Sequence, residues 1–239
     1  MKLYDRYLST QVQGLAEDTS RLTEDAVSHF KLNITPLLPA DRSAEVVELG
    51  CGYGRNLLAL RECGYQRVLG VDVSEEEVRY AKDVLGLEGV ILADCFEFLT
   101  GLGRVVDAVL LIDFLEHLEE EESIRLLEGA RTVLKIGGTL LIQAPNGAAP
   151  LSPWRYADIT HKRAYTPQSL AQSLTLAGFG RNKLRFLPAL APGSGWRSRL
   201  RRAAWWGLIN PGLRQFLRVA YGNDLGGIYS ANLIAVATK

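Results

Sequence analysis

The first candidate for chemistry is a run of glycines that directly follows a short apolar segment. The stretch Glu48–Gly54 reads E-L-G-C-G-Y-G, so three glycines alternate with other residues behind an acidic side chain. Glycine has no Cβ, so such a turn can adopt left-handed dihedral angles and let a ligand lie directly on the backbone. The N–H groups of a helix that we expect to begin near Asn56 would point toward that ligand. The pattern predicts a nucleotide-binding turn, but Arg55 stands where the dinucleotide fingerprint G-x-G-x-x-G has its third glycine.

Two aspartates follow the next two predicted strands. Asp72 lies about 20 residues beyond the glycines at the end of the strand 67–73, and Asp94 follows the strand 90–93. A carboxylate at the first of these positions can accept hydrogen bonds from both hydroxyls of a ribose. Because Ser74 already provides a helix-capping side chain, we interpret Asp72 as a ligand residue.

Two of the three histidines lie beside carboxylates. His117 follows the apolar segment 105–112 with Glu116 directly before it, and His161 lies in a polar loop with Asp158 nearby. A neutral imidazole suits the removal of a proton near pH 7. Either histidine is therefore a candidate general base. A structural role, such as bracing the loop or packing at a helix start, is the alternative for both.

These residues lie at the ends of alternating strands and helices. Strands are expected at 46–49, 67–73, 90–93, 105–112 and 139–144, with helices between them near 56–64, 74–85 and 119–135. The candidate ligand residues stand at the carboxyl ends of the strands. This pattern predicts a doubly wound, mostly parallel α/β sheet that binds its ligand at that edge.

The glycine turn, together with Asp72 and Asp94, resembles the class I S-adenosylmethionine-dependent methyltransferases over residues 44–180. The resemblance implies a seven-stranded Rossmann-like fold, with S-adenosyl-L-methionine as cofactor and S-adenosyl-L-homocysteine as product. It also implies that the turn holds the methionine part, Asp72 the ribose and Asp94 the adenine amino group. The cofactor-binding residues that it implies are Glu48, Gly50, Cys51, Gly52, Gly54, Asp72, Val73, Asp94, Cys95, Ile112 and Asp113.

A second resemblance concerns the acceptor. The loop 154–165 is rich in polar and aromatic residues, and the segment Asp158–Pro167 reads D-I-T-H-K-R-A-Y-T-P. A similar D-x-T-H-x-x-A-[FY]-T-P stretch is found in methyltransferases associated with bacterial surface polysaccharides. The resemblance implies O-methylation of a sugar hydroxyl, or a related group, on a glycan or on its lipid-linked or nucleotide-linked precursor.

The position of the loop selects between the two histidines. It emerges at the carboxyl edge of the sheet, where the methyl group must point, so we predict His161 as the general base and Asp158 as the residue that orients its ring. His117 is the second candidate. Glu116, His117 and Glu120 could also bind a divalent cation. Acidic residues here are more typical of a solvated helix start, and we expect no resident metal.

The formal net charge is zero, but the two parts of the chain differ in sign. The residues up to 144 include 25 acidic and 14 basic side chains, and those beyond include 2 and 13, which gives −11 and +11. The basic part contains an amphipathic segment, 196–221, in which we expect two helices joined by a turn at 210–212. Its arginines and tryptophans suit a membrane surface or an anionic acceptor. A lid or a homodimer contact is the alternative.

We predict a single domain. It comprises a helical extension (1–43), in which Tyr4, Tyr7 and His29 could cover the pocket, a cofactor-binding core (44–185), a basic helical insertion (186–225) and a final strand within 226–239.

The three cysteines lack C-x-x-C spacing and are typical of reduced thiols. The sequence shows neither a signal peptide nor an 18-residue apolar run, so we expect a cytosolic protein, with contact to the inner membrane face through 196–221 as an option.

Three other functions remain open at this point. An O-methyltransferase of a lipid or small phenol would use the same cofactor site. An RNA methyltransferase would explain the basic part, but neither an N-P-P-Y-type motif nor a catalytic P-C dipeptide is present, so no nucleic-acid partner is expected. A non-catalytic cofactor-binding protein would keep the glycine turn, and only absent turnover across acceptors would favour it.

Overall fold

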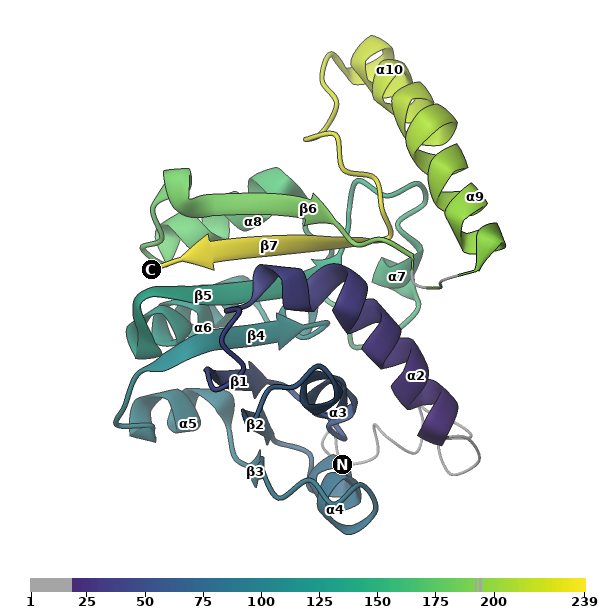
Figure 1. Ribbon diagram of the computed structural model, residues 1–239. Helices are drawn as coiled ribbons and strands as arrows, with labels where there is room; N and C mark the ends of the chain where they lie inside the picture. The colour runs from purple at the N-terminus through teal and green to yellow at the C-terminus, as the bar shows by residue number, and fades with distance from the viewer. Residues whose placement is uncertain (1–18, 192, 194) are drawn as a thin grey trace.

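The computed structural model describes residues 19–191, 193 and 195–239, and within them seven strands form one sheet (Figure 1). They are β1 (Glu45–Leu49), β2 (Arg67–Asp72), β3 (Val90–Leu92), β4 (Val106–Ile112), β5 (Leu134–Pro145), β6 (Leu184–Pro188) and β7 (Asn232–Thr238). Their order is β3-β2-β1-β4-β5-β7-β6, and the pairings are parallel except those of β7 with β5 and β6. The predicted doubly wound, mostly parallel sheet is confirmed.

Helices cover both faces of this sheet. On one face lie α2 (Thr19–His29), α3 (Arg55–Glu62) and α4 (Glu75–Asp83), and on the other lie α5 (Cys95–Gly101), α6 (Glu120–Val133) and α8 (Pro167–Leu176) (Figure 1). The remaining α-helices of the described chain are α7 (Pro153–Tyr156), α9 (Trp196–Ala204) and α10 (Asn210–Tyr221). Short 3-10 or π segments occupy Phe30–Ile34, Thr35–Leu37, Leu115–His117, Arg181–Lys183 and Trp205–Ile209.

Two apolar cores follow from this layering. Strand β1 is buried along its whole length, and its successive side chains point to opposite faces of the sheet. Val46 belongs to the core that contains Phe30 and Leu57, whereas Val47 belongs to the core that contains Leu126. A strand covered on both faces has no solvated side, which explains why β4 is apolar except for Asp107.

The N-terminal extension is helical from Thr19 to Leu37. After α2, a π segment and a 3-10 turn lead the chain toward β1, and Phe30 and Ile34 are fully buried against the sheet. Tyr4 and Tyr7, which we considered as pocket residues, lie outside the described residues, as does the rest of the extension before residue 19.

Several predicted boundaries differ from the observed ones. The helix expected to reach residue 135 ends at Val133, and β5 begins at Leu134, because Leu134 already pairs with Val106 before a shift in register. The limit expected at 185/186 falls inside β6, which pairs with β7 and therefore belongs to the sheet. The last strand begins at Asn232.

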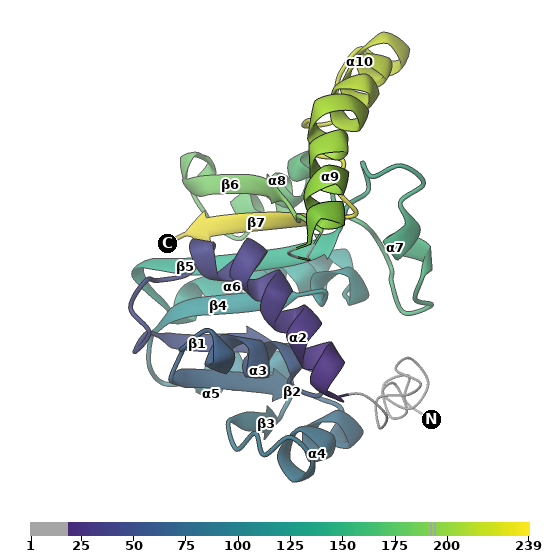
Figure 2. The same cartoon turned by 45° about the vertical axis from the view of Figure 1, so that its right-hand side comes forward.

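The predicted helical hairpin is wrong. α9, the π segment and α10 follow one another without a turn and form a single rod, hereafter the arm (residues 196–221), which projects away from the sheet (Figure 2). Pro211 lies in the first turn of α10, where a proline is tolerated, and the wider π turn before it makes room for its ring. The segment 210–212 therefore continues the helix. No helix in the described part of the chain is long and apolar enough to cross a membrane.

Candidate active site

The glycine turn adopts a backbone that favours glycine at each of its three positions. Gly50, Gly52 and Gly54 have φ angles of 71°, 53° and 84°, in the left-handed region. A Cβ at Gly50 would overlap the ring of Phe114, and one at Gly54 would lie 2.5 Å from Leu87. Both the dihedral angles and the close approach of neighbouring side chains therefore fix the turn between β1 and α3.

Asp72 supports this turn from the end of β2. Its Oδ2 accepts a hydrogen bond from the N–H of Gly52 (2.8 Å), and its Oδ1 accepts one from the N–H of Ser74 (2.9 Å). Burial raises the pKa of the carboxyl group, while these backbone donors lower it. Because a carboxylate oxygen can accept more than one hydrogen bond, Asp72 can still bind two ribose hydroxyls. The side chain of Ser74 caps α4 by accepting from the N–H of Glu77.

Glu48 is fully buried next to the turn. Its Oε1 accepts a hydrogen bond from Asn56 (2.6 Å), and its Oε2 has no hydrogen-bond partner within the described residues. Burial raises the pKa of Glu48 to about 8. A buried oxygen without a partner is costly, so this side chain suits a bound ligand that brings a hydrogen-bond donor.

The other residues of the predicted cofactor site divide between rim and core. Val73 and Asp94 are exposed at the rim, and Asp94 caps α5 by accepting two backbone N–H groups on its Oδ1 (2.8 and 3.2 Å). This leaves Oδ2 outside the cap. Cys51, Cys95 and Ile112 are buried, and burial raises the pKa of both thiols, to about 12 for Cys95.

Asp113 ends β4 with a φ angle of 52°, which is uncommon for a residue with a side chain. Gln143 donates its amide to both carboxylate oxygens at 3.1 Å, and Asn232 donates to Oδ1 at 3.4 Å. The Oε1 of Gln143 accepts from Nε2 of His29 (2.8 Å), so His29 links α2 to this network. Asp113 is open to solvent on one side and enclosed by protein on the others, and this enclosure raises the pKa of its carboxyl group.

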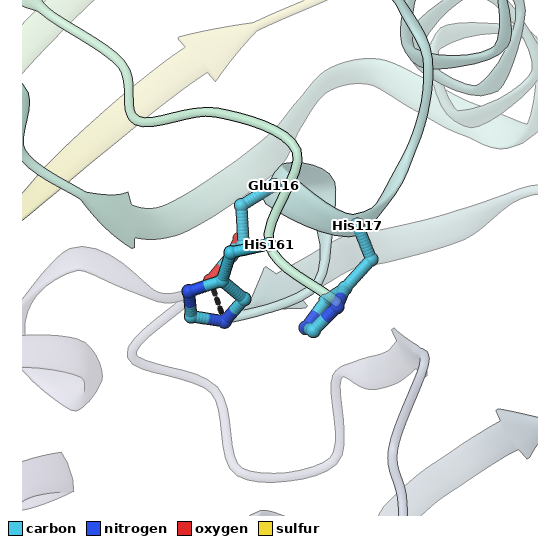
Figure 3. Close-up of side chains that lie close together, drawn as sticks. All are labelled: Glu116, His117 and His161. Atoms are coloured by element: carbon cyan, nitrogen blue, oxygen red, sulfur yellow. Dashed lines mark ion pairs between the residues drawn. The ribbon is translucent and has the colours of Figure 1, made fainter. Parts of the chain in front are cut away.

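Three side chains close to Asp113 form what we call the Glu116 cluster: Glu116, His117 and His161 (Figure 3). Nε2 of His161 lies 3.9 Å from Oε1 of Glu116, and the two imidazole rings meet edge to face with centroids 4.7 Å apart. Glu116 is fully buried, and its burial and the nearby Asp113 carboxylate raise its pKa well above the usual range. Burial and the neighbouring His161 lower the pKa of His117 to about 4.

Hydrogen bonds determine which nitrogen of each neutral ring carries the proton. Nδ1 of His161 lies 2.7 Å from the carbonyl oxygen of Trp154, which only accepts, so the lone pair is on Nε2. The hydroxyl of Thr160 donates to Asp158 (2.6 Å) and therefore accepts from Nδ1 of His117 (2.8 Å). In its neutral form His161 thus carries the lone pair on Nε2, and Thr160 orients the ring of His117.

Asp158 has a different partner from the one that we predicted. Its Oδ1 accepts hydrogen bonds from the N–H (2.8 Å) and the hydroxyl of Thr160, and through Thr160 it supports His117. The carbonyl of Trp154, not Asp158, holds the Nδ1 of His161. The reason is local, because aspartate commonly bonds to the backbone two residues further along the chain.

A cavity of about 520 Å³ lies between the arm, the region of α7 and the start of β7. Trp154, Trp205 and Trp206 line it, together with Arg201 and Arg202. The carbonyl oxygen of Trp154 also accepts a hydrogen bond from His161 in the Glu116 cluster, so the cavity and the cluster are neighbours. Tryptophan offers flat apolar contact area, and arginine binds phosphate or carboxylate groups. The cavity therefore suits a molecule that combines a ring with an anionic group.

Several residues of this site were not candidates in the sequence analysis. Thr160, Gln143 and Asn232 donate or accept the hydrogen bonds that hold the site together. Gln143 was detectable, because a polar side chain inside an apolar strand needs a buried partner. Glu120, which we considered as a cation ligand, is instead exposed and pairs with Arg163 at 2.8 Å.

Comparison with known families decides the class of the protein. A family model described as a methyltransferase domain matches residues 22–180, which is more than half of the chain. The chain belongs to this methyltransferase family. With its glycine turn and doubly wound sheet, the protein is an S-adenosylmethionine-dependent methyltransferase, and S-adenosylmethionine is its cofactor.

Solved methyltransferases share the fold of this one. A S-adenosylmethionine-dependent methyltransferase from Archaeoglobus fulgidus is 22% identical, with a TM-score of 0.65 over 91% of this chain and 94% of that one. One from Thermotoga maritima is 17% identical, with a TM-score of 0.62 over 99% and 97%. The plantazolicin methyltransferase BamL, solved with S-adenosylhomocysteine, is 17% identical, with a TM-score of 0.55 over 98% and 88%. A search of curated proteins finds no significant match.

Proposed function

We propose that this methyltransferase methylates a sugar hydroxyl on a glycan or on its lipid-linked or nucleotide-linked precursor. The observation that carries the proposal is the cavity beside the Glu116 cluster, which combines three tryptophans with Arg201 and Arg202. The tryptophan faces suit the apolar face of a sugar ring, and the arginines suit the phosphate of a carrier. Arg202 also donates to the carbonyls of Ala191 (3.1 Å) and Gly193 (2.9 Å), which holds its guanidinium at the cavity. A simple phenol, the alternative acceptor, offers these arginines no anionic group to bind.

The residues around the glycine turn fit the cofactor. Glu48 has an unpaired buried oxygen for a donor on the methionine part, Asp72 can accept the ribose hydroxyls, and Asp94 has Oδ2 for the adenine amino group. When bound, the cofactor supplies its methyl group as a sulfonium, and the C–S bond breaks as the acceptor oxygen bonds to carbon.

His161 is our first candidate for removing the proton of the acceptor hydroxyl. Its Nε2 carries the lone pair, and the residue that orients its ring also lines the cavity. His117 is the second candidate, but a pKa of about 4 makes it a weak base at neutral pH. Asp158 contributes indirectly, through Thr160 and His117.

The arm suits contact with an anionic membrane that carries a lipid-linked acceptor. It has six arginines and no acidic residue, and Trp196, Leu200 and Phe216 are each more than 60% exposed. Basic side chains beside exposed tryptophan are typical of helices that bind anionic lipid surfaces. The wild type should sediment with phosphatidylglycerol vesicles, and exchanging Arg197 and Arg199 for Gln should abolish this. If the wild type does not sediment, the arm is a lid or a homodimer contact.

An acceptor assay tests the proposal directly. Transfer of a labelled methyl group is compared for a nucleotide-linked sugar, the same sugar without its phosphates, a small phenol and an RNA. We expect transfer to the phosphorylated sugar, and a KM for that acceptor about tenfold higher after Arg201 and Arg202 are changed to Gln. Transfer to the phenol or the RNA alone would contradict the proposal.

A further inference from the structure

The Glu116 cluster combines one carboxylate with two imidazoles at the edge of the sheet where methyl transfer takes place. We propose that Glu116, His117 and His161 bind a divalent cation, and that the hydroxyl of the acceptor coordinates this cation during transfer. This inference rests on the proposed O-methylation and changes how the hydroxyl loses its proton. Carboxylate and imidazole donors suit Mn²⁺, Fe²⁺, Co²⁺ and Zn²⁺.

The spacing of the cluster fits a cation. One donor atom from each residue lies within 4.8 Å of the others. A cation with bonds of about 2.1 Å keeps its ligands within about 4.2 Å of one another, so a shift of roughly half an ångström is sufficient. Glu116 and His117 come from the segment after β4, and His161 comes from the loop after α7, so two separate parts of the chain converge on this point (Figure 3).

The carboxylate of Glu116 is the strongest indication of a missing partner. It is 0% exposed, and neither oxygen has a hydrogen-bond partner among the residues described. Nε2 of His161 lies 3.9 Å from Oε1 of Glu116, which is beyond hydrogen-bond distance. A buried carboxylate in such surroundings is stabilised by a cation that binds its oxygens directly.

Both imidazoles are held as metal-binding histidines usually are. The carbonyl of Trp154 holds Nδ1 of His161, and Thr160 holds Nδ1 of His117, with Asp158 behind Thr160. Such outer contacts fix the tautomer and the orientation of a ligating histidine, and for His161 they leave the lone pair on Nε2.

A cation at this position accounts for the activation of the hydroxyl. Coordination lowers the pKa of the hydroxyl, and its proton passes to solvent water. The oxygen lone pair then forms the bond to the methyl carbon while the C–S electron pair goes to sulfur. The products are the methylated acceptor, S-adenosylhomocysteine and a proton.

Binding of Mn²⁺ alone tests the inference without any acceptor. The full chain is treated with EDTA, desalted and titrated with Mn²⁺, and the free ion is measured from its EPR signal. We expect one site per chain, which Glu116→Gln and His161→Ala each weaken at least tenfold. Thr160→Val, which removes the support of His117, should weaken it by about 10- to 100-fold. Glu120→Gln, an exposed glutamate close by in the sequence, is the matched control and should bind like the wild type.

Thermal unfolding separates a lost site from a misfolded variant. Mn²⁺ should raise the Tm of the wild type and of Glu120→Gln but not that of Glu116→Gln, whose Tm without metal should stay close to that of the wild type.

No stoichiometric Mn²⁺ binding, or equal binding by wild type and Glu116→Gln, overturns the inference. Methylation of a sugar that continues unchanged in EDTA also overturns it while leaving the proposed function in place. Mn²⁺ binding with the expected pattern supports the site even if the acceptor is not a sugar.

Discussion

The glycine turn and the proposed acceptor side lie at the same edge of the sheet but are built differently. Glu48, Asp72 and Asp94 come from one continuous stretch of strands and helices. The proposed acceptor side combines the segment around α7, the arm and the start of β7, which lie far apart in the sequence. The first region depends on local backbone geometry, and the second depends on contacts between distant segments.

This difference indicates which substitutions each region tolerates. In the turn, left-handed dihedral angles and close neighbours leave little freedom at Gly50 and Gly54. On the proposed acceptor side, the lining side chains come from loops and from the arm, so we expect changes there to alter the acceptor while the sheet is preserved. The predictions below test this division.

Substitution of Gly50 should give the largest loss. Gly50→Ala places a Cβ in a left-handed conformation and against the ring of Phe114. We expect the affinity for S-adenosylmethionine, measured by calorimetry, to fall by at least about 100-fold, which corresponds to roughly 2.7 kcal/mol.

Gly86→Ala is the matched control. Gly86 also has a positive φ angle (64°), but its Cβ would meet nothing within 4 Å. This variant should lose about 1–2 kcal/mol of stability through strain and keep its cofactor affinity. Equal cofactor affinities for Gly50→Ala and the wild type would show that close packing does not constrain the turn.

Removal of His161 should affect turnover and not cofactor binding. We expect His161→Ala to lower kcat by about 10² or more with unchanged affinity for S-adenosylmethionine. His117→Ala should lower kcat less than His161→Ala does. Thr160→Val should lower kcat about as much as His117→Ala, because Thr160 holds the ring of His117. If His117→Ala abolishes turnover while His161→Ala keeps most of it, our order of the two histidines is reversed.

The same division explains what could be predicted from the sequence. The glycine turn and the position of Asp72 could be predicted from the sequence. Left-handed dihedral angles favour glycine, and a strand ends where its apolar run ends, so both features depend only on neighbouring residues. The partner of Asp158 could not be predicted, because spacing alone does not tell whether a carboxylate turns to Thr160 or to His161. The straight arm was missed for a similar reason, since the sequence does not show that a π turn precedes Pro211 and lets the helix continue.

Glu48 should make stability depend on pH. Its pKa is raised to about 8 in the folded protein, so between about pH 4.5 and 8 the folded state holds a proton that the unfolded state has lost. Stability from this group is greatest at low pH and declines through this window as pH rises. The free energy of unfolding of Glu48→Gln, measured with urea, should therefore fall less steeply with rising pH than that of the wild type, by up to about 1.4 kcal/mol per pH unit. Glu121→Gln, an exposed glutamate, is the control, and parallel profiles for Glu48→Gln and the wild type would contradict the assignment.

Calorimetric titration of S-adenosylmethionine into Asp72→Ala tests the central claim, that the carboxyl edge at β1 and β2 binds the cofactor. The variant loses the contacts to ribose and the hydrogen bond that supports Gly52, so we predict an affinity about 10- to 100-fold below that of the wild type. Asp83→Ala, an exposed aspartate at the end of α4, should bind as the wild type does. An unchanged affinity in Asp72→Ala would contradict the account.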